Sequence, residues 1–263
     1  MKLQSILLSS ALLSSTLFAG GGIVPVESAV EEIAVETSAW SFEFEPYMLI
    51  ASMSGDVHIG RVPNATPIDV DFGKILENLD MAAMAHFEAH NSNGWGLWLD
   101  YGFMDLSSDI TGPVGGVTNA SVRQGTLEAF GMYRQTLSNG YIDYLAGIRW
   151  WDNDFDISHN TLPVDIEIEE DWVDLVVGAR WTTAINESWK FSVLGTIGGL
   201  GLESDLTASA AIGVKYVIND LLDLDLQYKA LWADYETGTK GQKGYFAYDV
   251  TTYGPIIGLN FKF

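Results

Sequence analysis

The sequence predicts an all-β protein, an antiparallel transmembrane β-barrel of about ten strands (8 or 12 would also fit), with a short helix in its first long loop. Three observations support this fold. The chain opens with an export signal, most later segments alternate apolar and polar residues, and aromatic residues gather near the ends of those segments. Past the signal, no apolar run reaches the roughly 18 residues that a membrane helix needs, so any membrane crossing would be made by strands.

Composition excludes several classes of function. The 263 residues include 35 acids, 13 bases and no cysteine, for a net charge of -22. Such a charge argues against a nucleic-acid partner, because phosphate binding needs clustered Lys and Arg. The lack of cysteine excludes a disulfide framework, a thiolate metal site and a lipid-modified N-terminal cysteine. No motif predicts a cofactor.

Residues 1–19 are predicted to be a cleaved signal peptide. Lys2 supplies the positive charge at the start, and residues 6–18 form an apolar, serine-rich run. Ala19 would be the last residue before the cleavage site. Leu17, two residues earlier, is larger than the small residue expected at that position. A buried N-terminal helix is the alternative, and the three glycines at 20–22 disfavour it. Residues 20–39 are then an acidic periplasmic leader and residues 40–263 the outer-membrane barrel.

The alternation has a period of two. In WKFSVLGTIG, Trp189, Phe191, Val193 and Ile197 share one face of a strand. A soluble sandwich would turn such faces inward, whereas a membrane barrel turns them to lipid. Strands of ten or more residues, flanking aromatics and alternating short and long links favour the barrel. The predicted strands are 40–51, 80–91, 94–106, 122–137, 141–156, 171–185, 188–199, 206–218, 221–236 and 247–263.

The links predict which end lies outside. Short turns are expected at 91–94, 138–140, 186–188 and 218–220, and placing them in the periplasm also places the C-terminus there. Longer links are expected at 107–121, 157–170 and 237–246, with a shorter one near 201–205. An even number of strands lets the barrel close without exposed edges.

Residues 52–79 do not follow this pattern of long alternating strands and links. GDVHIGR and IDVDF are compatible with short strands, and FGKILENLD at 72–80 predicts a helix with Phe72, Ile75, Leu76 and Leu79 on one side. This insert is expected at the extracellular end, where it either caps the barrel or folds into the lumen.

The last strand ends on an aromatic residue. Its outward-facing set resembles the signal by which outer-membrane barrels are recognised for insertion, which implies contact with the insertion machinery. Outer-membrane lipid and lipopolysaccharide are the other expected partners, and the cell outer membrane is the expected location. The matching residues are Tyr253, Ile257, Leu259, Phe261 and Phe263.

Most of the mature chain resembles a family of small Gram-negative outer-membrane barrels of undefined function, described as porin-like or OmpW-like. The stretches that carry the resemblance are WVDLVVGARWTTAINESWKFSVLGTIGGLGLESD, ALWADYETG and YDVTTYGPIIGLNFKF, with PYMLIASMSGDVHIG and FGKILENLDMAAMAHFEA nearer the start. The resemblance implies location and shape, but no reaction and no catalytic residues.

The same alternation predicts a charged lumen. GIRW at 147–150 and GARW at 178–181 repeat one pattern, in which a glycine gives room to an inward arginine beside a lipid-facing tryptophan. These charges either pair to fill the interior or select passing solutes. The predicted lumen charge network is Glu43, Glu45, Glu88, Asp100, Glu128, Arg134, Asp143, Arg149, Asp174, Arg180, Lys190 and Lys229.

Two other clusters were candidates for chemistry. HFEAH puts His86, Glu88 and His90 on one face, but strand neighbours about 6–7 Å apart are too far apart to make a tight metal site alone. DNDFD at 152–156 begins like a calcium loop and then lacks the required glycine and glutamate. No metal site and no catalytic residue is therefore predicted.

The leading hypothesis is a non-enzymatic barrel, either a narrow pore or a structural and surface-interaction protein, with a charged lumen that the insert plugs or leaves open. A carrier for small hydrophobic compounds is the second hypothesis, and an open gap in the wall would support it. Pro46 and Pro255 are places where a ladder hydrogen bond is lost. An outer-membrane lipid hydrolase using His86 and Glu88 is third, and a secreted soluble sandwich last. The residues expected near a carrier's pocket are Met81, Met84, Trp98, Met104 and Trp151.

Overall fold

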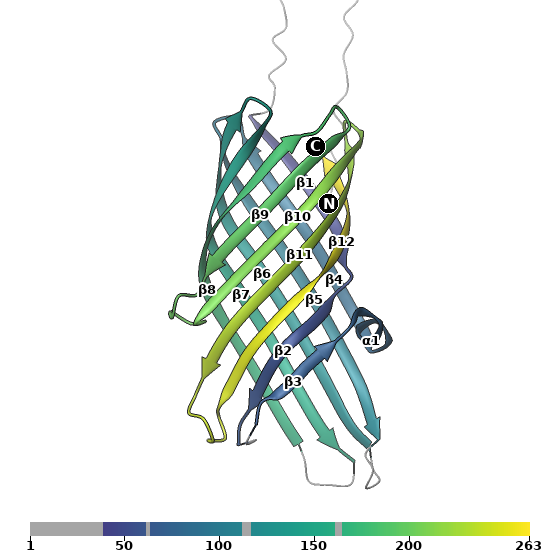
Figure 1. The fold of residues 1–263 in the computed structure, drawn as a ribbon, viewed down its shortest axis with the longest axis vertical. Helices are drawn as coiled ribbons and strands as arrows, with labels where there is room; N and C mark the ends of the chain where they lie inside the picture. Colours follow the sequence, from purple (N-terminus) through teal and green to yellow (C-terminus); the bar gives the residue numbers. More distant parts are fainter. Residues whose placement is uncertain (1–38, 62–63, 112–116, 161–164) are drawn as a thin grey trace, which may run out of the picture. The chain divides into compact units, whose positions relative to one another are not determined.

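The computed structural model describes residues 39–61, 64–111, 117–160 and 165–263. The predicted signal peptide, and all but the last residue of the predicted leader, lie outside them. Twelve strands form one antiparallel sheet, and one short helix precedes the fourth strand (Figure 1). The elements are β1 (Trp40–Leu49), β2 (Ser52–Ile59), β3 (Thr66–Val70), α1 (Phe72–Glu77), β4 (Leu79–Asn91), β5 (Trp95–Thr111), β6 (Val117–Leu137), β7 (Gly140–His159), β8 (Asp165–Ala184), β9 (Trp189–Gly198), β10 (Leu206–Asn219), β11 (Leu222–Thr237) and β12 (Phe246–Lys262).

The sheet closes on itself because β1 pairs with both β4 and β12. At the closing seam the Phe42 N–H donates to the Phe263 carbonyl over 2.8 Å, and the Phe263 N–H donates back over 3.0 Å. β2 continues β1 along β12 in the same register, with Leu49 opposite Ile256 and Ser52 opposite Tyr253. β1 and β2 together act as one strand, and with β4 to β12 they make the ten strands that surround the lumen. The short β3 only adds to the edge of β2. The predicted ten-stranded antiparallel barrel with one short helix is confirmed.

The apolar faces of the strands point outward. Leu175 on β8 and Ile212 on β10 are 60% and 52% exposed, whereas the charged Arg149 on β7 is 0% exposed. A soluble sandwich would have the opposite arrangement, so the outer surface is an apolar belt suited to lipid. Trp95 and Trp181 are also exposed, close to the short-turn end of the barrel. No helix in the described part of the chain is both long and apolar enough to cross a membrane.

At the end of the barrel opposite the short turns, several strands are longer than predicted. β6 begins at Val117 instead of residue 122, and β7 ends at His159 instead of residue 156. β8 begins at Asp165 instead of residue 171, and its added residues are acidic, with Glu169 opposite Asp154 of β7, which suggested a loop. Water on the outside tolerates such side chains while the backbone ladder continues, so polarity did not mark the end of the strand. These charges lie beyond the apolar belt.

The insert at 52–79 is largely part of the wall. Its first segment, β2, was expected in a separate excursion but pairs with β12 along its whole length. β3 pairs with β2, and α1 then returns the chain to β4. α1 begins at the cap Asp71, whose side chain accepts a 3.0 Å hydrogen bond from the Lys74 N–H. Ile75, only 4% exposed, anchors the helix in the apolar core.

Candidate functional site

The centre of the lumen holds a buried arginine. Arg149 donates from Nε to Glu128 Oε1 over 2.8 Å and from Nη1 and Nη2 to Thr207 and Thr196 over 2.8 Å each. Glu128 is directly opposite Arg149 on the neighbouring strand, so the register itself creates this pair. Arg149 and Glu128 are 0% and 1% exposed. These side chains fill the middle of the barrel.

A second group of charges lies nearer the short-turn end. Arg180 donates to Glu88 Oε2 over 2.8 Å and to Asp143 Oδ2 over 2.7 Å, and Arg134 donates from Nε to Asp143 Oδ1 over 2.7 Å. Glu88 also bonds His90 Nε2 at 2.7 Å. Arg134 Nη2 also lies 3.9 Å from Glu88 Oε2, so Glu88 and Asp143 each face both arginines, which compensates for their removal from water.

The lysines that face the lumen, Lys190 and Lys229 of the predicted network and Lys215 outside it, have different surroundings. Lys215 Nζ lies 3.4 Å from Asp225, 3.5 Å from Glu45 and 3.8 Å from Glu43. Lys229 Nζ lies 3.5 Å from Asp100 and 3.7 Å from Glu128. Lys190 lines a polar lumen pocket together with Arg180 and Lys215.

Asp174 lies opposite Arg149 in the β7–β8 register, but its side chain bonds other groups. It accepts hydrogen bonds from the indoles of Trp151 and Trp172 over 3.2 Å each, and from Ser204 Oγ over 2.8 Å. Trp172 stacks on Tyr235 with ring centroids 4.0 Å apart. Asp174 therefore fixes an aromatic layer that fills this side of the lumen beyond Arg149.

His86 is held between two carboxylates, with a hydrogen bond on one ring nitrogen only. His86 Nε2 lies 2.8 Å from Glu88 Oε1, and its Nδ1 lies 3.3 Å from Asp100 Oδ2. A hydrolase would need a nucleophilic hydroxyl beside the histidine, but the described partners of His86 are these two carboxylates. Within the described residues, no cluster of His, Asp or Glu could hold a metal ion.

The wall is not paired along its whole height. β1 pairs with β4 only from Trp40 opposite Asn91 to Pro46 opposite Ala85. Beyond Pro46, the first strand continues along β12 with β3 at its other edge, while β4 from Leu79 to Met84 pairs only with β5. α1 links the two diverging edges (Figure 1). Even-numbered residues of the first strand donate to β12, as Phe42 and Ile50 do, so the N–H that Pro46 lacks is missing from the β1–β12 ladder, which lapses between Phe44 and Tyr47 without a change of register.

An apolar cavity of about 330 Å³, the wall cavity, occupies this divergence. It reaches from inward side chains such as Leu49 and Met104 to Met48 and Leu76, which are 54% and 57% exposed on the outside. Met48 lies opposite lipid-facing Ile257 on β12, so the cavity opens on the apolar belt. The lining residues are Tyr47, Met48, Leu49, Ala51, Phe72, Ile75, Leu76, Leu79, Ala82, Ala83, Met84 and Met104.

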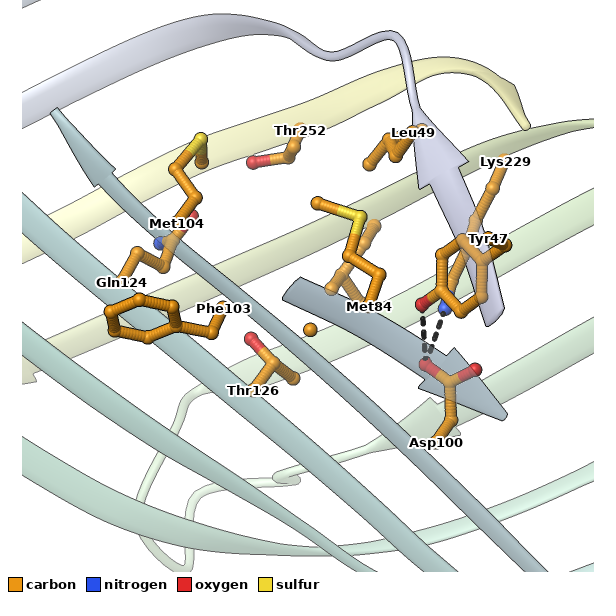
Figure 2. Close-up of a pocket in the computed structure, with 12 residues that line it drawn as sticks. Tyr47, Leu49, Met84, Asp100, Phe103, Met104, Gln124, Thr126, Lys229 and Thr252 are labelled. Carbon is orange, nitrogen blue, oxygen red and sulfur yellow. Dashed lines mark hydrogen bonds and ion pairs between the residues drawn. The ribbon is translucent and has the colours of Figure 1, made fainter. Parts of the chain in front are cut away.

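A smaller space of about 60 Å³, the lumen pocket, adjoins the wall cavity from inside. The two share Tyr47, Leu49, Met84 and Met104. Figure 2 shows Met84 in the middle of the pocket and Met104 on its far side, beside Gln124 and Phe103. Asp100 accepts a 3.0 Å hydrogen bond from the Tyr47 hydroxyl at the polar end. The cavity and the pocket together form an apolar recess that ends on polar groups.

The residues expected near a carrier's pocket divide into two groups. Met84 and Met104 line both spaces. Met81 is 57% exposed on the outside, Trp98 lines the polar pockets nearer the short turns, and Trp151 is buried in the aromatic layer. Leu49, Ala82 and Ala83, which also line the wall cavity, were not predicted. The features of the sequence that could have indicated the wall cavity are Pro46 and the apolar helix that leads back to β4.

The predicted insertion signal lies on the outer surface of β12. Ile257, Leu259 and Phe261 are each between 42% and 43% exposed, and Phe263 is 67% exposed. Tyr253 shares their face and lies opposite Ser52 of β2. A role in insertion stays a prediction.

No protein-family model matches the chain, and no curated protein matches its sequence. Its fold is similar to the translocator domain of the autotransporter NalP from Neisseria meningitidis, with 11% identity, 88% of this chain and 90% of that chain covered, and a TM-score of 0.45. It is also similar to the outer-membrane protease OmpT from Escherichia coli, with 8% identity, 87% of this chain and 99% of that chain covered, and a TM-score of 0.46. A third similar structure is Ail, the attachment invasion locus protein of Yersinia pestis, solved in complex with sucrose octasulfate. Its identity is 8%, 85% of this chain and 98% of that chain are covered, and the TM-score is 0.39. The likeness is one of fold, and an OmpW-like affinity stays a prediction. The chain forms a closed antiparallel β-barrel with an apolar outer surface.

Proposed function

We propose that this protein is a non-enzymatic outer-membrane barrel that binds small hydrophobic molecules and passes them between its lumen pocket and the surrounding lipid. The observation that carries the proposal is the wall cavity, which connects inward-facing Met104 with outward-facing Met48 and Leu76. Ligand sites are concave, mostly apolar and few per protein, and this cavity has that character. Its mouth lies on the lipid-facing belt, where apolar molecules concentrate.

The narrow pore has less support. Arg149, Asp143 and Asp174 are 0% exposed and hydrogen-bonded, and they fill the path that an ion would take. Conduction would require several kcal/mol of buried ion pairing to break. We expect no discrete conductance steps from the folded protein in a planar bilayer. Steps whose ion selectivity changes in an Arg149→Ala/Arg180→Ala double variant would instead favour the charge-selective pore.

Photolabelling of the protein in lipid nanodiscs tests the proposal. A diazirine-bearing decane is the probe, and mass spectrometry locates the labelled residues. We expect labelling at Met84 and Met104, because both line the wall cavity. The variant Ala82→Trp should abolish it by filling the cavity from β4. Ala85→Trp is the matched control: the same change on the same strand, at the residue opposite Pro46 where pairing is complete. Unlabelled methionines, or labelling that Ala82→Trp leaves unchanged, would refute the proposal.

A further inference from the structure

Methionine is concentrated in the lining of the wall cavity. The chain has seven methionines among its 263 residues, yet three of the twelve residues that line the cavity are methionine. Two of them, Met84 and Met104, also line the lumen pocket. Both face the interior of that pocket in Figure 2, with Met84 at its middle. Two long, unbranched side chains therefore shape the recess where its two spaces meet.

Each of these two methionines lies opposite a small residue across the β4–β5 ladder. Met84 is opposite Gly102, and Met104 is opposite Ala82. A Cβ added to Gly102 would lie 3.9 Å from the Tyr47 hydroxyl and 4.0 Å from Met84 Cγ, which are ordinary contact distances, so the space beside Met84 is not filled. The other edge of β4 faces the wall cavity instead of a strand. Both side chains therefore have room to change rotamer.

Methionine has three rotatable bonds, so it fills gaps of different shape, and its thioether makes favourable contacts with aromatic rings. We infer that the recess accepts apolar molecules of differing shape, ring systems as well as chains, and that Met84 and Met104 determine this range. This inference rests on the proposed function. It defines the ligand class by apolarity and size, and no single molecular shape is required.

A stiffer lining would favour flexible ligands. Leucine is close to methionine in apolarity and volume, but it is branched and has fewer rotamers. A chain can adapt its own torsions to a cavity of fixed shape, whereas a rigid ring system needs the cavity to adapt. Flexible, methionine-rich surfaces accept different partners because they repack around each one. Replacing both methionines by leucine should therefore weaken the binding of rigid molecules more than that of chains.

Competition among three unlabelled hydrocarbons tests this inference. Decane is a chain, naphthalene a flat ring system and adamantane a compact cage. Each is added at equal content in the lipid of nanodiscs and competes with the diazirine-bearing decane. Labelling is read at Leu49 and Ala83, which line the wall cavity and are unchanged in every variant. On the unaltered protein we expect all three to compete within about threefold of one another, a spread that adaptable side chains can absorb.

The variant Met84→Leu/Met104→Leu should separate rigid from flexible competitors. We expect naphthalene and adamantane each to weaken about fivefold relative to decane, because a rigid group that fits poorly forces a stiff lining out of its preferred rotamers. Met132→Leu is the matched control, since Met132 is a buried methionine in a separate apolar cluster with Trp98 and Phe130. It should leave the three competitors in the same ratio.

The outcomes separate the two proposals. Competition by decane alone on the unaltered protein overturns the inference and leaves the wall cavity as a binding site. An unchanged ratio in Met84→Leu/Met104→Leu, or an equal change in Met132→Leu, also overturns it. Absence of labelling by the diazirine-bearing decane on the unaltered protein removes the proposed function itself. If the double variant does not fold, each single leucine variant is compared with Met132→Leu in the same way.

Discussion

Pro46 lies opposite Ala85 as the last pair between β1 and β4, and beyond it the two strands no longer share a ladder. A closed barrel ordinarily has no free edges. Here the edge of β4 from Leu79 to Met84 faces a cavity instead of a strand. The opening is therefore built into the pairing of the wall.

Hydrogen exchange should reveal this free edge. We expect backbone amides in Leu79–Met84 to exchange faster than those in Ala85–Asn91 of the same strand, because only the second segment has partners on both sides. Mass spectrometry of peptides from protein in nanodiscs measures the difference. Equal protection of the two segments would show that the ladder continues past Pro46.

The buried ion pair of the lumen should dominate stability. Arg149→Met leaves the Glu128 carboxylate with only the loose Lys229 contact, and we expect it to lower the free energy of unfolding by about 3–5 kcal/mol. Arg149→Met/Glu128→Gln should recover part of this loss. Denaturant unfolding in lipid vesicles, followed by tryptophan fluorescence, gives the values.

Arg123→Gln is the control for that series. Its side chain is 51% exposed on the outer surface, with Asp154 and Asp152 at 3.5 Å and 3.9 Å. Exposed ion pairs contribute about 0–1 kcal/mol. A loss in Arg149→Met no larger than that in Arg123→Gln would contradict the assignment of Arg149 to the core.

The glycine of GIRW has a different purpose from the one expected. A Cβ added to Gly147 would lie 2.1 Å from the Ala129 carbonyl and 2.8 Å from Phe130 Cα, so the glycine allows close approach of β6 and does not chiefly make room for Arg149. We expect Gly147→Ala to destabilise the barrel by about 1–3 kcal/mol. Gly195→Ala, where an added Cβ meets nothing within 4 Å, should have little effect in the same unfolding assay. Equal effects of the two would remove this explanation.

The pKa of Asp154 should report the acidic outer wall. Partial burial and the adjacent charge of Asp152 raise its pKa above the ordinary 3.8, against the opposing effect of Arg123. Since the folded state holds this proton more tightly, its contribution to stability is present below pH 3.8 and is lost as pH rises through the folded value. NMR titration of the carboxyl carbon should show Asp152→Asn lowering the pKa and Arg123→Gln raising it. Shifts of the opposite sign would contradict the stated causes.

Alternation alone was enough to predict the inner face of the barrel. Arg149, Arg180 and Glu88 were expected in the lumen from their parity, and they lie there because a strand offers only two faces. Pairs between neighbouring strands, such as Arg149 with Glu128 and Arg180 with Asp143, also follow from the alternation, but pairs across the lumen do not. Arg180 meets Glu88 across 92 positions of sequence, and such a contact depends on the stagger between strands and the curvature of the barrel, which no local pattern records.

The wall opening was only partly predictable. Pro46 indicated a lost hydrogen bond, but whether a strand ends, bulges or changes partner at a proline depends on the chain beside it. Here β2 continues along β12, and Gly55 and Gly254 allow close contact with backbone carbonyls of the neighbouring strand. These are tertiary contacts, so the continuous register of β1 and β2 could not be predicted from periodicity.

That continuous register also decides where the barrel is mechanically weakest. The first and last strands are joined from Glu43 to Ile59 on one side and from Phe246 to Lys262 on the other, whereas β1 and β4 are joined only from Trp40 to Pro46. Under lateral tension in the membrane, the barrel would tear between β1 and β4 before the seam where its two ends meet. β1, β2 and β3 would then move away from β4 together, while β1 and β2 stay paired with β12.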